Sequence, residues 1–168
     1  MADNSEIFTA SLRAFAQKVP DQIGTVVRKS SLQMARDVIL RTPVGNPDLW
    51  KNKHPPKGYV GGRLRANWNV SIGQADSTTT NAIDKDGAET IARAAEALGN
   101  ADGTKDVFIL NSLPYAIPVE YGHSAVQAPA GMVRITVAEF QQYVDRAAAA
   151  IQSEGGIVGE QPDRSPAD

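Results

Sequence analysis

The sequence predicts an α+β fold: two N-terminal helices, a small, mostly antiparallel sheet, and a C-terminal helix that covers the sheet. Three observations support this prediction. Apolar residues recur at helical spacing near both ends of the chain, segments typical of strands are few, and these segments do not alternate regularly with helices. The last observation disfavours a doubly wound parallel sheet. A chain of 168 residues suits one domain, which we expect over residues 1–153.

The two N-terminal helices are expected at residues 6–18 and 21–42. The apolar positions of the first are Ile7, Phe8, Leu12, Phe15 and Ala16, and those of the second are Ile23, Val26, Val27, Met34, Val38 and Ile39. Pro20 separates the two helices, because proline fits the first turn of a new helix. Pro43 ends the second helix, since the residue before a proline avoids helical backbone angles.

A long extended loop is expected at residues 43–62, which contain four prolines and four glycines. In compact domains, loops of this length are usually functional or disordered. Residues 63–73 then alternate between apolar and polar side chains, which predicts a strand with Trp68 on its buried face. The apolar run at 107–110 predicts a second strand, and residues 132–135 predict a short third one.

Further helices are expected at residues 86–98 and 136–153, with one or two helical turns at 114–121. Thr136 and Glu139 match a capping box at the start of the last helix, in which each side chain bonds to the backbone amide of the other residue. The remaining residues, 154–168, are polar and acidic and are expected to form a flexible tail.

The charges are segregated along the chain, although the net charge is only −2. Residues 41–65 contain six basic residues and one acidic residue, whereas residues 66–106 contain seven acidic and three basic residues. A net charge close to zero argues against a dedicated nucleic-acid-binding protein. The segregation favours electrostatic pairing between copies of the chain, or a basic loop that faces a polyanion.

The composition excludes several kinds of chemistry. The chain has no cysteine, which excludes disulfides, thiolate zinc sites and cysteine nucleophiles. Two histidines leave little for a histidine-based metal site or a catalytic triad. No signal peptide is visible, and no apolar run approaches the roughly 20 residues that a membrane span needs. We expect a soluble protein, made in a cytoplasm, with no cofactor and no membrane contact.

Contact residues are expected in loop 43–62 and in segment 114–131. The basic candidates of the loop and of the residues just after it are Lys51, Lys53, Lys57, Arg63 and Arg65, and the aromatic candidates of the loop are Trp50 and Tyr59. The candidates in the second segment are Tyr115, Glu120, Tyr121 and His123. Basic side chains suit an acidic protein surface or DNA phosphates, and aromatic side chains supply buried area at interfaces. Glu120 is also expected to serve as a salt-bridge or cap partner.

Two other classes of function stay open at this stage. A small metal-dependent nuclease or hydrolase would need carboxylates such as Asp106 and Glu120 to converge on one magnesium ion. The glycine-rich stretch 58–63 lacks the spacing of a phosphate-binding loop, and a strand is expected after it instead of a helix. The second of these classes is a host-directed binding module.

The order of four short segments is more specific than any single motif. The segments are Arg-Thr-Pro-Val-Gly at 41–45, Gly-Arg-Leu-Arg-Ala-Asn-Trp at 62–68, Asn-Ser-Leu-Pro-Tyr-Ala-Ile-Pro-Val-Glu-Tyr-Gly-His-Ser at 111–124, and Gln-Ala-Pro-Ala-Gly-Met-Val-Arg at 127–134. Over about residues 20–150, the chain resembles the tailed-phage neck or minor tail-component family. Members of this family help to join the capsid portal to the tail.

The resemblance implies a structural virion protein without catalytic activity, located at the head–tail junction after assembly in the cytoplasm of the bacterial host. It implies a ring, six- or twelve-fold, that connects or completes the interface between capsid connector and tail. The implied partners are further copies of the chain, connector or head-closure proteins, and tail-terminator or tail-tube proteins, with nonspecific contact to DNA in the channel. A closed ring joins unlike patches of neighbouring copies, and segregated charges can supply such patches.

Overall fold

The computed structural model describes the backbone of residues 4–50, 54–123 and 127–153, and the side chains of these residues except 4–20 and 123. Within this part of the chain, helices accompany a two-stranded antiparallel sheet, which confirms the predicted α+β class. The expected tail at 154–168 lies outside the described residues, as do Lys51 and Lys53.

A single N-terminal helix, α1 (Asn4–Arg41), replaces the two that the sequence predicted. It has 38 residues and is therefore about 57 Å long. The predicted break at Pro20 is wrong, although a proline in a helix interior costs about 3 kcal/mol through a lost hydrogen bond and a steric clash. The helix packs against several other helices.

The sheet consists of β1 (Asn69–Ile72) and β2 (Val107–Leu110), which pair antiparallel with Asn69 opposite Leu110 and Ile72 opposite Val107. The prediction of a strand at 107–110 is confirmed. The strand predicted at 63–73 begins only at Asn69, because the residues before it form a short helix.

That helix is α2 (Arg63–Ala66), which begins after Gly62 at a positive φ of 110°. Leu64 and Ala66 of α2 are buried, and so is Trp68, which follows the end of the helix. The alternating apolar residues Leu64, Ala66 and Trp68 are therefore buried although residues 63–66 form a helical turn and not a strand. The prediction that Trp68 belongs to the core is confirmed.

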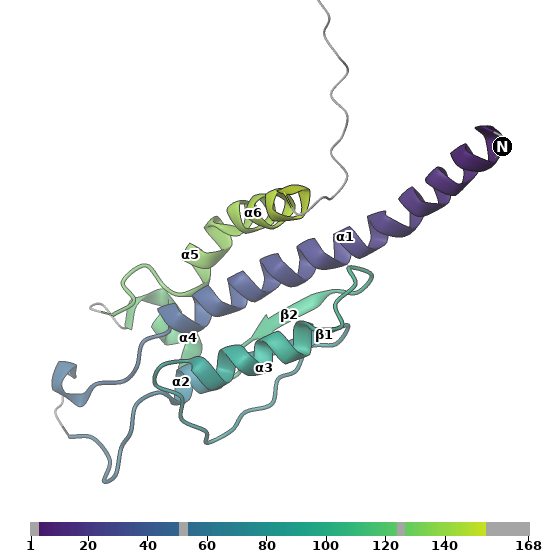
Figure 1. Cartoon of the computed structure of the whole chain (residues 1–168). Helices are drawn as coiled ribbons and strands as arrows, with labels where there is room; N and C mark the ends of the chain where they lie inside the picture. The colour runs from purple at the N-terminus through teal and green to yellow at the C-terminus, as the bar shows by residue number, and fades with distance from the viewer. Residues whose placement is uncertain (1–3, 51–53, 124–126, 154–168) are drawn as a thin grey trace, which may run out of the picture.

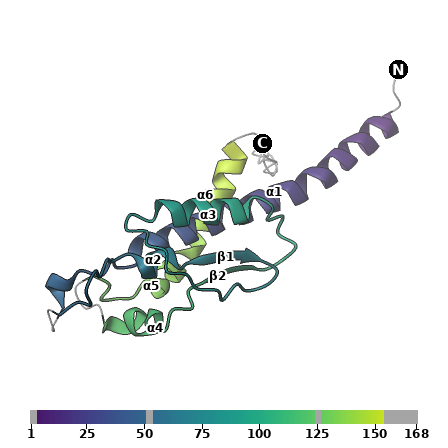
Figure 2. The same cartoon turned by 90° about the horizontal axis from the view of Figure 1, so that it is seen from below.

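Helix α1 lies between the two other layers of the molecule (Figures 1 and 2). On one side, α3 (Ala88–Leu98) packs along both β1 and α1, and on another side α6 (Phe140–Ser153) packs along α1. The C-terminal helix thus packs in the sheet region, as predicted, with α1 as its main direct neighbour. The helix predicted at 86–98 is confirmed as α3.

Two further helices connect the sheet to α6. Helix α4 (Ala116–Pro118) continues into a wide π-type turn, η2 (Val119–His123), in agreement with the helical turns predicted for this segment. Helix α5 (Val133–Ala138) occupies most of the segment that was predicted as a short strand, so that prediction is wrong.

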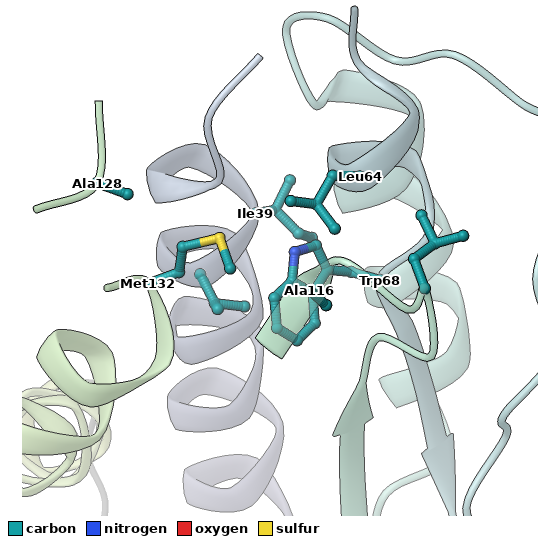
Figure 3. Packing of buried hydrophobic residues seen from close by; sticks show 8 residues of the cluster. Ile39, Leu64, Trp68, Ala116, Ala128 and Met132 are labelled. Carbon is teal, nitrogen blue, oxygen red and sulfur yellow. The ribbon is translucent and has the colours of Figure 1, made fainter. Parts of the chain in front are cut away.

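The hydrophobic core lies where the C-terminal end of α1 meets α2 and the segment from Leu113 to Met132 (Figure 3). Its buried residues are Val38, Ile39, Leu64, Trp68, Leu113, Ala116, Ala128 and Met132. The core therefore supports the two segments in which the sequence placed the candidate contact residues. None of the helices in the described part of the chain is both long and apolar enough to span a membrane.

Candidate functional site

The loop at 43–62 folds back so that its two ends are in contact. A Cβ atom built on Gly61 would clash with the backbone oxygen of Gly45, and one built on Gly45 would clash with the hydroxyl of Tyr59. Between the two ends, Asn46 accepts a hydrogen bond of 3.0 Å from the amide of Asp48 and caps the short 3-10 helix η1 (Pro47–Leu49). The loop is thus held by its own packing and hydrogen bonds.

Aromatic packing holds the outer part of this loop. Trp50 and Tyr59 form an edge-to-face pair, with ring centroids 4.8 Å apart and ring planes at 67°. Leu49 and Val60, their neighbours in sequence, are exposed. The loop therefore presents both aromatic and aliphatic side chains on its outside.

Tyr115 joins this loop from the second candidate segment. Burial raises the pKa of the Tyr115 hydroxyl, the positive charge of Arg63 lowers it and Tyr59 raises it, so that the hydroxyl interacts electrostatically with both groups. Gln127 donates a hydrogen bond of 3.2 Å to the backbone oxygen of Val44. The structure thus brings together the two segments that the sequence analysis selected separately.

We define the loop-end surface as Trp50, Tyr59, Arg63 and Tyr115. Ile117 and Tyr121, which lie in the same segment as Tyr115, are 69% and 70% exposed. The guanidinium of Arg134 lies 5.2 Å from the ring centroid of Tyr121, within the range of a cation–π contact. The loop and α4 lie at the end of the molecule opposite the N-terminus of α1 (Figures 1 and 2).

The predicted basic residues divide into several groups. Lys57 is exposed, and Arg63 donates a hydrogen bond of 3.0 Å to the backbone oxygen of Thr80 near the surface. Lys51 and Lys53 lie outside the described residues, and so does the side chain of His123. Within the described part of the chain, the positive charge of this region therefore rests on Lys57 and Arg63.

Arg65 has an internal role, in contrast to its prediction as a contact residue. Its guanidinium donates hydrogen bonds to the backbone oxygens of Leu40, Thr42 and Lys85. The first two lie at the C-terminal end of α1, where carbonyl groups lack helical partners and a cation is favoured. Burial lowers the pKa of Arg65, and nearby carboxylates act in the opposite direction. Arg65 thus joins the end of α1 to the segment before α3.

Glu120 is buried and acts within the chain, which confirms its expected role as a cap and salt-bridge partner. Its carboxylate accepts hydrogen bonds of 2.7–3.0 Å from the backbone amides of Met132, Val133 and Arg134. These amides lie at the start of α5, where they have no helical partner and where a negative charge is favoured. The predicted cap at Thr136 is wrong, because α5 has already begun there and Glu120 serves its N-terminus.

Arg134 completes the contact with Glu120. Its guanidinium lies 3.2 Å from one carboxylate oxygen and donates a further hydrogen bond of 2.7 Å to the backbone oxygen of Glu120. Burial favours the neutral form of the carboxyl, but the three amides and Arg134 outweigh this effect and hold the pKa of Glu120 below its ordinary value. Glu120 therefore fixes the turn after Tyr115 to α5 and supports the loop-end surface from behind.

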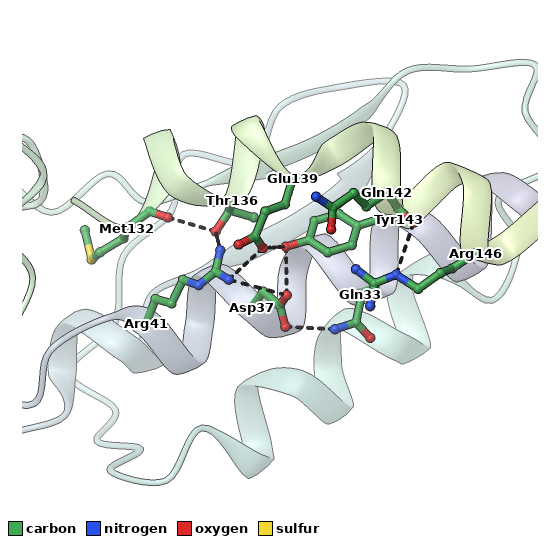
Figure 4. Close-up of polar contacts among 9 residues, drawn as sticks. All are labelled: Gln33, Asp37, Arg41, Met132, Thr136, Glu139, Gln142, Tyr143 and Arg146. Atoms are coloured by element: carbon green, nitrogen blue, oxygen red, sulfur yellow. Dashed lines mark hydrogen bonds and ion pairs between the residues drawn. The ribbon is translucent and has the colours of Figure 1, made fainter. Parts of the chain in front are cut away.

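A polar network that was not predicted from the sequence joins α1 to the C-terminal helices (Figure 4). Arg41 donates hydrogen bonds to Thr136 at 3.1 Å and to Glu139 at 2.7 Å. The hydroxyl of Tyr143 lies 2.6 Å from Glu139 and 2.7 Å from Asp37. Burial raises the pKa of Tyr143 above its ordinary range, and the two carboxylates raise it further. The sequence signal that could have predicted this network is Tyr143 itself. It stands in an amphipathic helix, and a buried tyrosine hydroxyl needs a hydrogen-bond partner.

The nuclease alternative needs carboxylates that converge on a metal ion. Among the described residues, no His, Asp and Glu side chains form a group of three or more that could hold a metal ion. Both carboxylate oxygens of Glu120, one of the two acids considered for a nuclease, accept hydrogen bonds from residues 132–134. The arrangement is instead suited to contact with another macromolecule, through exposed aromatic and basic side chains on a supported loop.

Comparisons with protein-family models, with curated proteins and with solved structures find no match to this chain.

Proposed function

We propose that this protein is a structural component of a tailed-phage virion. In this proposal it forms a ring at the head–tail junction and connects or completes the interface between capsid connector and tail. The observation that carries the proposal is the contact between loop 43–62 and segment 114–131. These two regions contain most of the segments through which the sequence resembles the phage neck and minor tail-component family, and they share one exposed end of the molecule.

The loop-end surface supports a role in protein contact by its composition. Tyrosine, tryptophan and arginine are the residues most enriched at the centres of interfaces, and Trp50, Tyr59, Arg63 and Tyr115 provide them. The surface is held by ring packing and by backbone contacts, so that little conformational freedom is lost when a partner binds.

The charges support contact between unlike surfaces. Lys57 and Arg63 lie at the loop end, whereas residues 66–106 have seven acidic and three basic side chains. A ring needs one patch that meets a different patch on the next copy, and opposite charges favour the correct pairing. Arg65 and Glu120 contribute to this proposal as positioning residues, since their hydrogen bonds are made within the chain.

Concentration-dependent mass measurement tests the proposal. We expect the mass of the purified protein to rise with concentration towards a closed multiple of the chain, or to do so when connector or tail-tube proteins are added. High salt should weaken the assembly, because screening reduces the attraction between exposed charges. A strict monomer under all of these conditions would contradict the proposal.

A further inference from the structure

The N-terminal part of α1 extends beyond every other helix and strand that the structure describes (Figures 1 and 2). Helix α6 runs along α1 and ends at Ser153, near the part of α1 that follows Pro20. Before that point, α1 continues for residues 4–20. Isolated helices of about this length are marginal in water, so this segment would gain stability from a binding partner.

A groove lies where α6 ends on α1. It has a volume of about 290 Å³ and is lined by Gln22, Ile23, Val26 and Val27 of α1 and by Ala148, Ile151 and Gln152 of α6. Ile23 is 51% exposed there, although it belongs to the apolar stripe of its helix. The groove is slightly smaller than typical small-molecule sites and has no charged side chain in its lining, which makes it suited to apolar protein side chains.

The sequence of α1 continues this apolar face towards the N-terminus. Positions 8, 12, 15 and 19 hold Phe, Leu, Phe and Val, and positions 23 and 26 in the groove hold Ile and Val. Steps of three and four residues place all six positions on one face of a helix. A face with this spacing over residues 8–19 is typical of a helix that packs against another helix.

We propose that the apolar face of residues 4–20 in one copy of the chain binds the groove between α1 and α6 of a second copy. This inference rests on the proposed assembly of the chain into a ring, and it names a surface that holds two copies together. It adds a second contact region, at the end of the molecule opposite the loop-end surface.

Covalent geometry requires a second copy as the source of this segment. Residues 4–20 belong to the same continuous helix as Ile23 and Val26, so they cannot turn back into the groove of their own chain. The chain after Ser153 contains only two large apolar residues, Ile157 and Val158, together with a glycine pair and two prolines. That sequence does not match a helical face with four large apolar positions.

The area that such a contact would bury is sufficient for a specific interface. A phenylalanine ring buries about 150–250 Å², so Phe8 and Phe15, with Leu12 and Val19 beside them, would bury on the order of 600 Å² on the segment. The groove holds about 290 Å³ and accepts only part of this surface, so the segment must also pack on the turns of α1 and α6 that flank the groove. With these turns included, the total approaches the roughly 1,200 Å² at which specific protein interfaces begin.

Cysteine cross-linking tests this inference directly, because the chain has no cysteine of its own. The test pairs Leu12→Cys in one preparation with Gln152→Cys in another, since Gln152 is an exposed residue at the groove. Gln152 lines the same groove as Gln22, and residues 12 and 22 are ten positions, or about 15 Å, apart on one helix. A disulfide needs Cα atoms within about 7 Å, so a disulfide between positions 12 and 152 must join two chains.

We expect a covalent dimer when the two variants are mixed under mild oxidation. A mixture of Leu12→Cys with Glu96→Cys, an exposed position on α3, serves as the matched control and should give none. The double variant Leu12→Cys/Gln152→Cys should give a ladder of products that ends at the size of the ring. Circular dichroism of each variant checks that its helix content is unchanged.

The outcomes separate this inference from the proposed ring. Absence of the mixed dimer, in a protein whose mass still rises with concentration, would overturn the inference and leave the ring in place. A mixed dimer of the two single variants would support the contact. If the double variant then formed no product above two chains, the result would contradict the ring. Equal cross-linking of Leu12→Cys to positions 152 and 96 would also overturn the inference, because it would indicate random collision.

Discussion

The indole nitrogen of Trp68 donates a hydrogen bond of 2.7 Å to the hydroxyl of Thr42, and both side chains are buried. Thr42 in turn donates to the backbone oxygen of Val38 at 2.7 Å. This pair joins the Thr-Pro-Val segment at the end of α1 to the Gly-Arg-Leu-Arg-Ala-Asn-Trp segment before β1. Two of the four segments on which the family resemblance depends are thus connected through one buried hydrogen bond.

Replacement of Thr42 by Val should destabilise the protein. The change keeps the volume of the side chain and leaves the buried indole N–H of Trp68 without its partner, which costs about 1–3 kcal/mol. Urea unfolding, followed by tryptophan fluorescence, measures the loss. Thr79→Val, at an exposed position, is the matched control and should change the free energy of unfolding by less than about 0.5 kcal/mol. Equal effects of the two variants would show that the buried hydrogen bond is unimportant.

Glu120→Gln should destabilise the protein at pH 7 and have little effect in acid. The folded state holds the pKa of Glu120 below its ordinary value of about 4.3, so the charged carboxylate stabilises the fold above this value. That contribution is lost as the pH falls through the folded pKa, because the carboxyl is then protonated.

Unfolding curves at pH 7, 5 and 3.5 check this prediction. We expect a loss of about 1–3 kcal/mol at pH 7 and a smaller difference at pH 3.5. Glu96→Gln, at an exposed position, should match the unchanged protein throughout. A loss for Glu120→Gln that is independent of pH would contradict the role of its charge.

Tyr143→Phe should weaken the contact between α6 and α1. It removes the hydroxyl that lies between Asp37 and Glu139, and hydrogen bonds to charged groups are worth about 1.5–3 kcal/mol. Burial, followed by the two carboxylates, raises the pKa of Tyr143, so this stabilisation is complete below the unfolded value of about 10 and declines at higher pH. Unfolding at pH 7 and above pH 10 measures both effects.

Tyr121→Phe, at an exposed ring, is the control for Tyr143→Phe. If Tyr143→Phe lowered the free energy of unfolding by the same amount at all pH values, the role of the Tyr143 hydroxyl would be refuted.

Gly87→Ala should destabilise the protein more than Gly58→Ala. Both glycines have positive φ, at 86° and 77°, which disfavours any other residue. A Cβ on Gly87 would also lie 2.9 Å from Cγ2 of Ile39, whereas a Cβ on Gly58 meets nothing within 4 Å. The difference should be about 1–3 kcal/mol, the usual cost of overpacking, and thermal unfolding measures it. If both variants lost the same stability, the cost would come only from the positive φ of the backbone and not from the contact with Ile39.

Tyr115→Ser should reduce assembly without unfolding the protein. Tyr115 is partly exposed in the loop-end surface, and truncation of a central interface aromatic typically costs 2 kcal/mol or more of binding energy, about 30-fold in affinity. Ile83→Ser, at another exposed apolar residue, is the matched control and should leave assembly nearly unchanged. Mass measurement over a range of concentrations compares the two variants. Equal assembly of both would remove Tyr115 from the interface.

The sequence predicted the elements whose signal is local. The helix at 86–98, the strand at 107–110 and the buried position of Trp68 follow from hydrophobic spacing, and the structure confirms them. The C-terminal part of α1 carries Val38 and Ile39 into the core, as their spacing suggested.

The errors arise where one pattern fits two structures or where the partner is distant in sequence. Leu64, Ala66 and Trp68 alternate as in a strand, but the first two lie in the helical turn that begins after Gly62, and all three are still buried. Arg65 binds carbonyl groups that lie 23 and 25 residues earlier in the chain, and no local signal indicates this. Arg65 was therefore predicted as a surface contact residue, although its guanidinium binds carbonyl groups at the end of α1.

Electron microscopy of phage particles made without this protein tests the central proposal most directly. If the protein joins head to tail, the preparation should contain filled heads and finished tails that remain separate, and supply of the intact chain should restore joined particles. Joined, infectious particles in the absence of the protein would contradict the proposal.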